Sequence, residues 1–386
     1  MIDAGDDTVA LRLLHTADWH LGMPFASFPE ATRRKLERSR IDVLTDVFGL
    51  AERENVDAVL CAGDLFDSPD PGEPWWKALL TILRSLRWER RKIFMLPGNH
   101  DPLTRSSVWD PEHPFRRGLP SYVHVIDREN YEAPLSDDAV LYASPCRGAS
   151  SSKDQAMGLP AREAGDARIR IGMVHGMTFD LEGYQANFPI RRDAAFERGF
   201  DYIALGDTHS FRDTATQGRP PMVYPSAPEP TRFGERNAGN VAMVLVTRNR
   251  RVQLREQPVA RWTWREETVD DVDALQRLSR ENLRQTVLRL TVRGFFSPAD
   301  FQAAEEICSR IVGGDLVDGL AGACLCDRTD MSLDAVGAER FFEECPDEIR
   351  TAAKRLEAMS LTTTPEAPIA KKALLKLYRL ARKETV

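Results

Sequence analysis

Five short apolar runs, each followed at once by a cluster of Asp, Asn or His, constrain this chain more than any other feature. They cover residues 9–15, 56–61, 93–96, 169–174 and 202–205. Their short length and β-branched residues favour strands. In layered α/β folds, ligands bind at the carboxyl ends of the strands. We therefore expect the five clusters to meet at one edge of a single domain.

Helical patterns lie between the first three of these apolar runs. Apolar residues recur at helical spacing over residues 29–54, and a second helical pattern covers residues 75–86. Strands that alternate with helices favour a layered α/β domain. Strand patterns return over residues 240–256, so this domain is expected to span residues 1–256.

The middle of the chain predicts a smaller second domain. A chain of 386 residues exceeds the usual size of one hydrophobic core. After a connector over residues 257–268, an alternating run at 287–292 precedes a helical pattern at 298–311. These patterns predict a small α+β domain over residues 270–345.

The remaining residues, 346–386, are interpreted as a helical tail. The sequence Thr362-Thr363-Thr364-Pro365 is typical of a linker. Residues 367–383 then form an amphipathic pattern with a basic rim. Two interpretations remain open, a helix that packs on its own domain and a helix that docks on a partner through its apolar face.

The five clusters contain residue types that bind metal ions. Four of the chain's seven histidines lie in them, a concentration that is unusual for core histidines. Asp18 and His20 are two residues apart, which points both side chains to the same side of a strand end. Mixed imidazole and carboxylate ligands suit Mn²⁺, Fe²⁺ or Zn²⁺. The candidate ligands are Asp18, His20, Asp64, Asn99, His175, Asp207 and His209, with His100 beside them.

Such a ligand set can hold two metal ions. Two ions about 3.5–4 Å apart can bind and hydrolyse a phosphodiester. One activates a water molecule, and the other stabilises the charge that develops on the leaving oxygen. A carboxylate must bridge ions held so close, and Asp64 is the predicted bridge because Gly63 lets the backbone turn tightly. Two interpretations of Asp67 remain open: it contacts and supports the metal ligands, or it only forms a turn. His15 is interpreted as a packed strand-end residue.

Charge, cysteine content and hydropathy limit the kinds of molecule that this chain can bind and the compartment in which it works. The net charge of −7 and the pI near 5.7 argue against a broad phosphate-binding surface, although a metal site could still touch phosphates locally. The six cysteines are scattered and are interpreted as reduced thiols. No run approaches the about 18–20 apolar residues that cross a membrane. We therefore expect a cytoplasmic protein without a membrane partner.

The motifs resemble, in order and spacing, those of the calcineurin-like metallophosphoesterases. A finer similarity over about residues 9–256 is to the SbcD-type DNA repair nucleases, the bacterial counterparts of the eukaryotic meiotic-recombination double-strand-break nuclease. This resemblance implies a layered β-sandwich flanked by helices, then a capping domain and a helical tail. The motifs are Asp18-Trp19-His20, Gly63-Asp64-Leu65-Phe66-Asp67, Gly98-Asn99-His100-Asp101, Val174-His175-Gly176 and Gly206-Asp207-Thr208-His209, and Phe233-Gly234-Glu235 supports the finer similarity.

The resemblance also implies roles for these residues. One metal would be held by Asp18, His20, Asp64 and His209, and the second by Asp64, Asn99, His175 and Asp207. His100 would donate a proton to the leaving group or stabilise its charge, and Asp101 would orient His100. The family normally has Gly-His-x-His where this chain has Gly-Asp-Thr-His. Either Asp207 is a carboxylate ligand, or the second site is half-occupied or inactive.

The activity implied by the resemblance is that of a Mn²⁺-dependent DNA nuclease, both exonuclease and endonuclease, in DNA repair or processing. Two Mn²⁺ per chain are expected, with Mg²⁺, Fe²⁺ or Zn²⁺ as alternatives. The resemblance further implies a homodimer and an SbcC-type coiled-coil ATPase, on which the C-terminal region would dock. Two other hypotheses stay open. One is a small-molecule phosphodiesterase, and the other is a DNA-end-binding protein with a weakened metal site.

Overall fold

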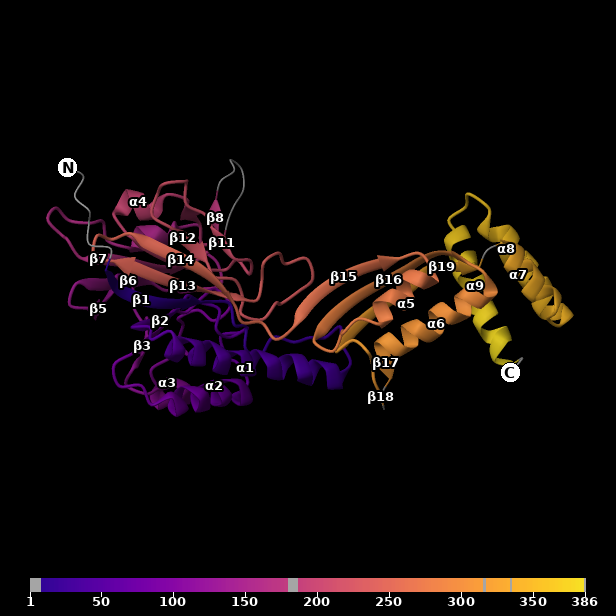
Figure 1. Ribbon diagram of the computed structural model, residues 1–386, viewed down its shortest axis with the longest axis horizontal. Coiled ribbons are helices and arrows are strands. Elements are labelled where there is room, and N and C mark those ends of the chain that lie inside the picture. Colours follow the sequence, from indigo (N-terminus) through magenta and orange to yellow (C-terminus); the bar gives the residue numbers. More distant parts are fainter. Residues whose placement is uncertain (1–7, 180–186, 315–316, 334, 385–386) are drawn as a thin grey trace. The chain divides into compact units, whose positions relative to one another are not determined.

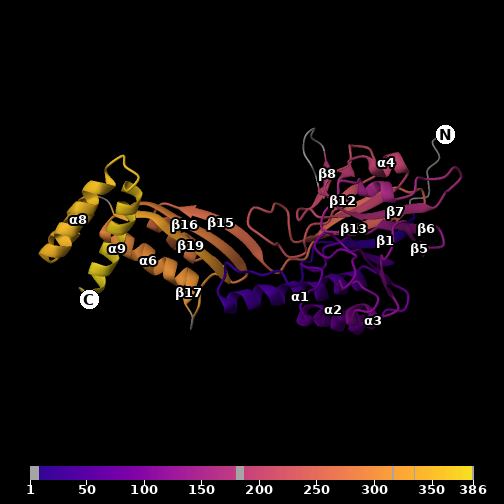
Figure 2. The same cartoon turned by 180° about the vertical axis from the view of Figure 1, so that it is seen from behind.

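The chain divides into two units, Met1–Trp262 and Thr263–Val386, with the boundary inside the predicted connector. Figures 1 and 2 show the computed structural model from opposite sides. It describes residues 8–179, 187–314, 317–333 and 335–384. Within these ranges, no helix combines the length and the apolar character that crossing a membrane requires.

The first six-stranded sheet of the first unit is built mostly from the early strands of the chain. Its four parallel strands are completed at one edge by two antiparallel strands. In spatial order they are β14 (Val252–Pro258), β13 (Asn240–Thr247), β1 (Val9–Thr16), β2 (Ala58–Cys61), β3 (Lys92–Met95) and β4 (Val123–Val125). Helices pack on its outer face through buried side chains such as Leu44, Val47 and Phe48. These helices are α1 (Glu30–Arg53), α2 (Glu73–Leu86) and α3 (Pro114–Gly118).

A second six-stranded sheet faces the first. In spatial order it contains β11 (Arg212–Asp213), β12 (Met222–Tyr224), β10 (Tyr202–Gly206), β7 (Ile169–His175), β6 (Ala139–Ser144) and β5 (Tyr131–Ser136). Its outer face packs against η1 (Gln155–Gly158) and α4 (Ala194–Arg198), and a small pair is formed by β8 (Thr178–Phe179) and β9 (Ile190–Arg191). Between the sheets, alternate residues such as Leu13, Leu60 and Ile171 form a fully buried core. This arrangement confirms the predicted α/β layered sandwich flanked by helices.

The second unit contains a three-stranded parallel sheet in the order β15-β16-β19. Its strands are β15 (Thr263–Val269), β16 (Thr286–Phe296) and β19 (Ala323–Leu333), with a short pair of β17 (Gly313–Gly314) and β18 (Val317–Asp318). Helices α5 (Val272–Ser279) and α6 (Pro298–Val312) add buried residues such as Leu275 and Phe301. Residues 263–268, which were predicted to be part of a connector, therefore belong to a strand.

The last helices pack into the core of this second unit. They are α7 (Ala335–Glu343), α8 (Asp347–Ser360) and α9 (Ala367–Glu384). Phe342, Ala353, Leu375 and Tyr378 are buried in the same cluster as the sheet residues. The structure therefore favours the interpretation in which the apolar face of the C-terminal helix covers its own unit.

Candidate metal centre

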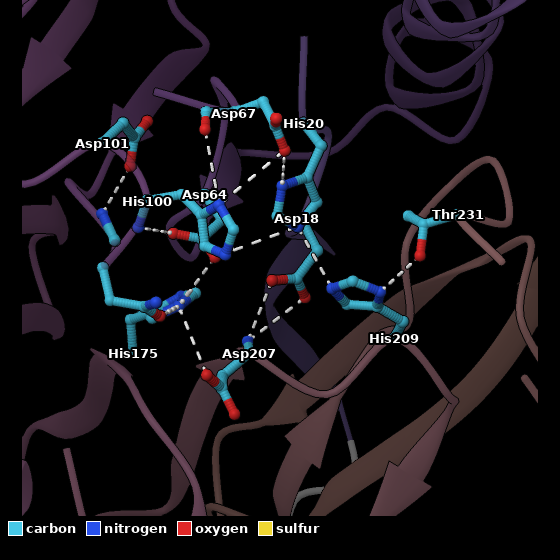
Figure 3. Close-up of polar contacts among 12 residues, drawn as sticks. Asp18, His20, Asp64, Asp67, His100, Asp101, His175, Asp207, His209 and Thr231 are labelled. Carbon is cyan, nitrogen blue, oxygen red and sulfur yellow. Dashed lines mark hydrogen bonds and ion pairs between the residues drawn. The ribbon is translucent and has the colours of Figure 1, made fainter. Parts of the chain in front are cut away.

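The strand ends bring together every residue that the sequence predicted as a ligand. β1 is followed by Asp18 and His20, β2 by Asp64, and β3 by Asn99. On the opposite sheet, β7 ends at His175 and β10 is followed by Asp207 and His209. Figure 3 labels six of these residues, all except Asn99, and shows their side chains gathered in one cluster.

Asp64 lies between the two halves of this cluster. Its Oδ2 is 3.9 Å from Nε2 of His20 and 3.4 Å from Nε2 of His175. Its Oδ1 accepts a hydrogen bond of 2.8 Å from the backbone N–H of His100. Because that bond fixes the carboxylate, Oδ2 faces both histidines, which is the orientation that a bridging ligand requires.

The distances within each half fit one metal ion. Metal–ligand bonds are about 2.0–2.2 Å long, so two ligand atoms up to about 4.2 Å apart can contact the same ion. Nε2 of His20 and Nε2 of His209 are 3.1 Å apart. Both residues and Asp18 offer ligand atoms that all lie within 4.8 Å of one another. Nε2 of His175 is 2.9 Å from Oδ1 of Asn99 and 4.0 Å from Oδ1 of Asp207.

The Nδ1 atom of each ligand histidine is held from outside the centre. Nδ1 of His20 donates to Oδ1 of Asp67 over 3.0 Å, which shows that Asp67 contacts the site. Nδ1 of His175 donates to the carbonyl oxygen of Ala62 over 2.8 Å. These contacts direct Nε2 toward the other ligands of the centre, the usual arrangement of ligand histidines.

His209 is held by two residues to which the sequence assigned no role. Its Nδ1 is 2.8 Å from Oγ1 of Thr231 and 2.8 Å from Oε1 of Glu235. Oε2 of Glu235 also accepts a bond of 2.8 Å from the backbone N–H of Thr231. The loop from Thr231 to Glu235 therefore orients His209, and only the family-like Phe-Gly-Glu segment indicated that this region mattered.

Asp101 contacts backbone rather than the His100 ring, which differs from the predicted orienting role. Its Oδ2 accepts from the backbone N–H groups of Leu65 and Phe66 over 3.0 and 3.1 Å, and its Oδ1 accepts from that of Gly98 over 2.7 Å. The carboxylate thus joins the loops after β2 and β3. Three backbone donors satisfy a buried carboxylate better than one imidazole could.

His100 is the accessible member of the cluster. Its side chain is 46% exposed, whereas those of His20 and His175 are almost completely buried. Its Nδ1 is 3.4 Å from the carbonyl oxygen of Asp67 and 3.7 Å from Oδ1 of the same residue. His100 is therefore close to the ligands and also open to a substrate.

Strained backbone supports the cluster. Asp18, His20, Asp64 and Asp207 have positive φ angles of 55°, 44°, 52° and 106°. Such conformations are rare outside glycine and concentrate at functional sites. Gly98 allows a close approach, because a Cβ atom there would lie 2.2 Å from Oδ1 of Asp64.

Protonation reflects an excess of buried negative charge. Burial raises the pKa of Asp18 to about 7 and also raises that of Asp207. Burial alone would lower the pKa of His175, but nearby carboxylates, Asp64 first, raise it to about 10. Without a metal, the cluster balances its charge by holding protons, so its donor set fits cations.

Comparison with known proteins agrees with this geometry. The family model of Calcineurin-like phosphoesterases matches residues 11–211, more than half of the chain. An uncharacterized metallophosphoesterase, YhaO of Bacillus subtilis, is 27% identical over 272 residues, which cover 68% of this chain and 64% of the relative.

Two further relatives have names that refer to DNA breaks or to a nuclease. The DNA double-strand break repair protein Mre11 of Saccharolobus solfataricus is 25% identical over 201 residues, covering 52% of this chain and 50% of the relative. A component of the nuclease SbcCD of Rhodobacter capsulatus is 32% identical over 171 residues, covering 43% of this chain and 39% of the relative. In these alignments the chain spans less than two-thirds of the length of each relative.

Proposed function

The chain belongs to the calcineurin-like phosphoesterase family, and on that premise we propose that it is a metal-dependent DNA nuclease. The coarser function, hydrolysis of phosphoester bonds at a metal site, follows from the family and from the clustered His and Asp residues. The observation that carries the proposal is Asp64, whose one carboxylate oxygen faces a histidine from each half of the site.

In this proposal, two ions are held as the spacing of the donors suggests. Asp18, His20, Asp64 and His209 would hold one, and Asp64, Asn99, His175 and Asp207 the other. When bound, such metals would supply a nucleophile from water at neutral pH and stabilise charge on the phosphate oxygens. Mn²⁺ is the preferred ion of the proposal because nitrogen and oxygen donors are mixed, and Mg²⁺, Fe²⁺ and Zn²⁺ are the alternatives to test.

His100 is assigned to the leaving group. An imidazole near the metals that is also open to solvent can donate a proton to the departing oxygen. Asp67 positions this ring through its carbonyl oxygen and also holds His20 through its carboxylate. One residue thus connects a proposed metal ligand with the proposed proton donor.

Two observations support DNA as the substrate. The names of the Mre11 and SbcCD relatives refer to DNA breaks and to a nuclease. In addition, exposed basic residues occur on β11 and in loops that follow strands of this acidic chain, where they can attract a phosphate backbone locally. They are Arg105, Arg147, Lys153, Arg212, Arg232 and Arg236.

A coiled-coil ATPase partner and a homodimer belong to the same proposal and rest on the resemblance to SbcD-type nucleases. The buried face of α9 packs on its own unit, so a partner would contact the other side. Exposed apolar side chains there include Ile369 and Leu380, with Leu361 in the preceding segment. Ile369→Asp should prevent co-purification with an SbcC-type ATPase, whereas unchanged co-purification would remove this part of the proposal.

One assay separates the candidate functions. The protein is incubated with Mn²⁺ and linear duplex DNA, and in parallel with bis-p-nitrophenyl phosphate. Cleavage of DNA that Asp64→Asn abolishes and Asp213→Asn retains supports the nuclease, because Asp213 is exposed on β11. Cleavage of the small ester alone would instead identify a small-molecule phosphodiesterase. Binding of DNA without cleavage of either substrate would identify a DNA-end-binding protein.

A further inference from the structure

The loop after β6 begins beside the segments that carry the metal centre. β6 and β7 are parallel neighbours, and Ser144 pairs with Val174, the residue before His175. Cys146 then donates its backbone N–H to the carbonyl oxygen of Pro97 over 3.0 Å, and its Sγ lies 3.6 Å from the carbonyl oxygen of His175. The start of this loop is therefore fixed to both segments that carry one half of the centre.

A cavity of about 710 Å³ opens beside this anchored loop. Its size suits one or two nucleotides, because sites for small ligands usually measure about 300–1,000 Å³. Ser144, Arg147, Ser150 and Lys153 line it, together with Phe188. No residue of the proposed metal centre is among its described lining residues, so it is a neighbouring space rather than the centre itself.

The basic groups of this cavity are available to a ligand. Nη1 of Arg147 lies 4.0 Å from Oε1 of Glu129, and both side chains are more than half exposed, so this ion pair is weak. Lys153 is exposed on the same loop. The acidic Asp154 is already engaged, since Oδ1 accepts from the backbone N–H of Ala156 and Oδ2 pairs with Arg191 at 3.5 Å.

We propose that this cavity binds the phosphate of a nucleotide next to the scissile phosphodiester in a single strand of DNA. Arginine and lysine are the usual partners of phosphate oxygens, and the exposed Ser150 can add a hydroxyl donor. A duplex is too wide for a cavity of this volume, so a single strand enters. The inference rests on the proposed nuclease function and names a strand-binding subsite for it.

The test measures binding, which does not require cleavage. A fluorescein-labelled single-stranded deoxyoligonucleotide is titrated in metal-free buffer at several salt concentrations, with anisotropy as the readout. Arg147→Gln should raise the Kd about tenfold, as expected for the loss of a charged hydrogen bond. It should also reduce the slope of log Kd against log salt concentration by about 0.7, the change expected for one phosphate contact on a single strand.

The control variants separate a phosphate contact from a structural effect. Lys153→Gln should act as Arg147→Gln does, and Arg147→Lys should restore the salt slope because it keeps the charge. Arg117→Gln is the matched control, since Arg117 is exposed on α3 in a similarly loose pair of 3.8 Å with Glu112. Unchanged slopes in the Arg147 and Lys153 variants, or an equal change in the control, would overturn the subsite.

Cleavage of the same oligonucleotide by the unaltered protein with Mn²⁺ is measured in parallel. Cleavage with unchanged salt slopes in the variants would refute the subsite and leave the nuclease standing. Binding that depends on Arg147 without cleavage would count against the nuclease and leave a site that binds a single strand of DNA. Absence of binding by the unaltered protein would overturn the subsite directly.

Discussion

Replacement of Asp207 by asparagine removes one negative charge from the half of the centre that contains His175. Oδ1 of Asp207 is 4.0 Å from Nε2 of His175, and its side chain is 16% exposed. At about 4 Å and an effective dielectric constant of about 20, two unit charges interact by about 4 kcal/mol. Asparagine keeps an oxygen donor but not the charge. The cost of burying the carboxylate offsets part of the attraction, so a net loss of about 2 kcal/mol is expected. We therefore expect one of two metal sites to weaken about 30-fold.

Isothermal titration with Mn²⁺ measures this change directly. The unaltered protein should bind two ions per chain, and Asp207→Asn should retain one tight site, because Asp18, His20 and His209 form a separate group. Asp207→His should restore the second site, since an imidazole at this position can supply a nitrogen donor. Asp213→Asn, an exposed change on β11, should bind as the unaltered protein does.

Two results would refute this reasoning about Asp207. If Asp207→Asn binds two ions with unchanged affinities, the carboxylate is not a ligand. If the unaltered protein never binds more than one ion in excess Mn²⁺, the second site is incomplete. In that case the departure from the Gly-His-x-His pattern would explain an inactive half.

Three further changes probe the surroundings of the centre. Glu235→Gln removes the charged partner of His209 and should weaken metal binding about 10–100-fold in the same titration. Gly98→Ala places a Cβ 2.2 Å from Oδ1 of Asp64, so it should abolish activity and lower the free energy of unfolding in urea. Burial lowers the pKa of His15 to about 3, so between pH 6.5 and 3 the unfolded chain binds more protons than the folded one. The free energy of unfolding should therefore fall with decreasing pH in this window, by up to about 1.4 kcal/mol per pH unit. Urea titrations at pH 4–7 measure this slope. The free energy of unfolding of His15→Gln should depend less steeply on pH.

The convergence of the ligands could be predicted from the sequence because it depends on strand direction alone. A short apolar strand fixes where its carboxyl end lies, and parallel neighbours bring those ends to one edge. Asp18, Asp64 and His175 follow three different strands, yet the structure groups them within ligand distance of one another. Where the sequence predicted an element, as at residues 9–15 and 29–54, apolar periodicity placed its ends within one residue of those of β1 and α1.

The contacts that support the ligands could not be predicted. Thr231 and Glu235 reach His209 from a loop more than twenty residues away, and Ala62 uses only a backbone carbonyl for His175. No spacing rule relates such partners. The strand β15 was missed because it is an edge strand in which only Val269 is buried. It therefore lacks the alternation of apolar and polar side chains that predicts a strand.

Metal binding and folding of the centre should be coupled through charge, at a site where the backbone is already strained. Each positive φ at Asp18, His20, Asp64 and Asp207 costs about 1–3 kcal/mol, and such conformations persist only where surrounding contacts impose them. Backbone hydrogen bonds join the same loops, as from the N–H of Asp207 to the carboxylate of Asp18 at 2.9 Å. A cation that neutralises the buried carboxylates relieves their repulsion without changing these backbone conformations. Chelation should therefore lower the melting temperature of the first unit while leaving its secondary structure intact, since a ligand stabilises the state that binds it.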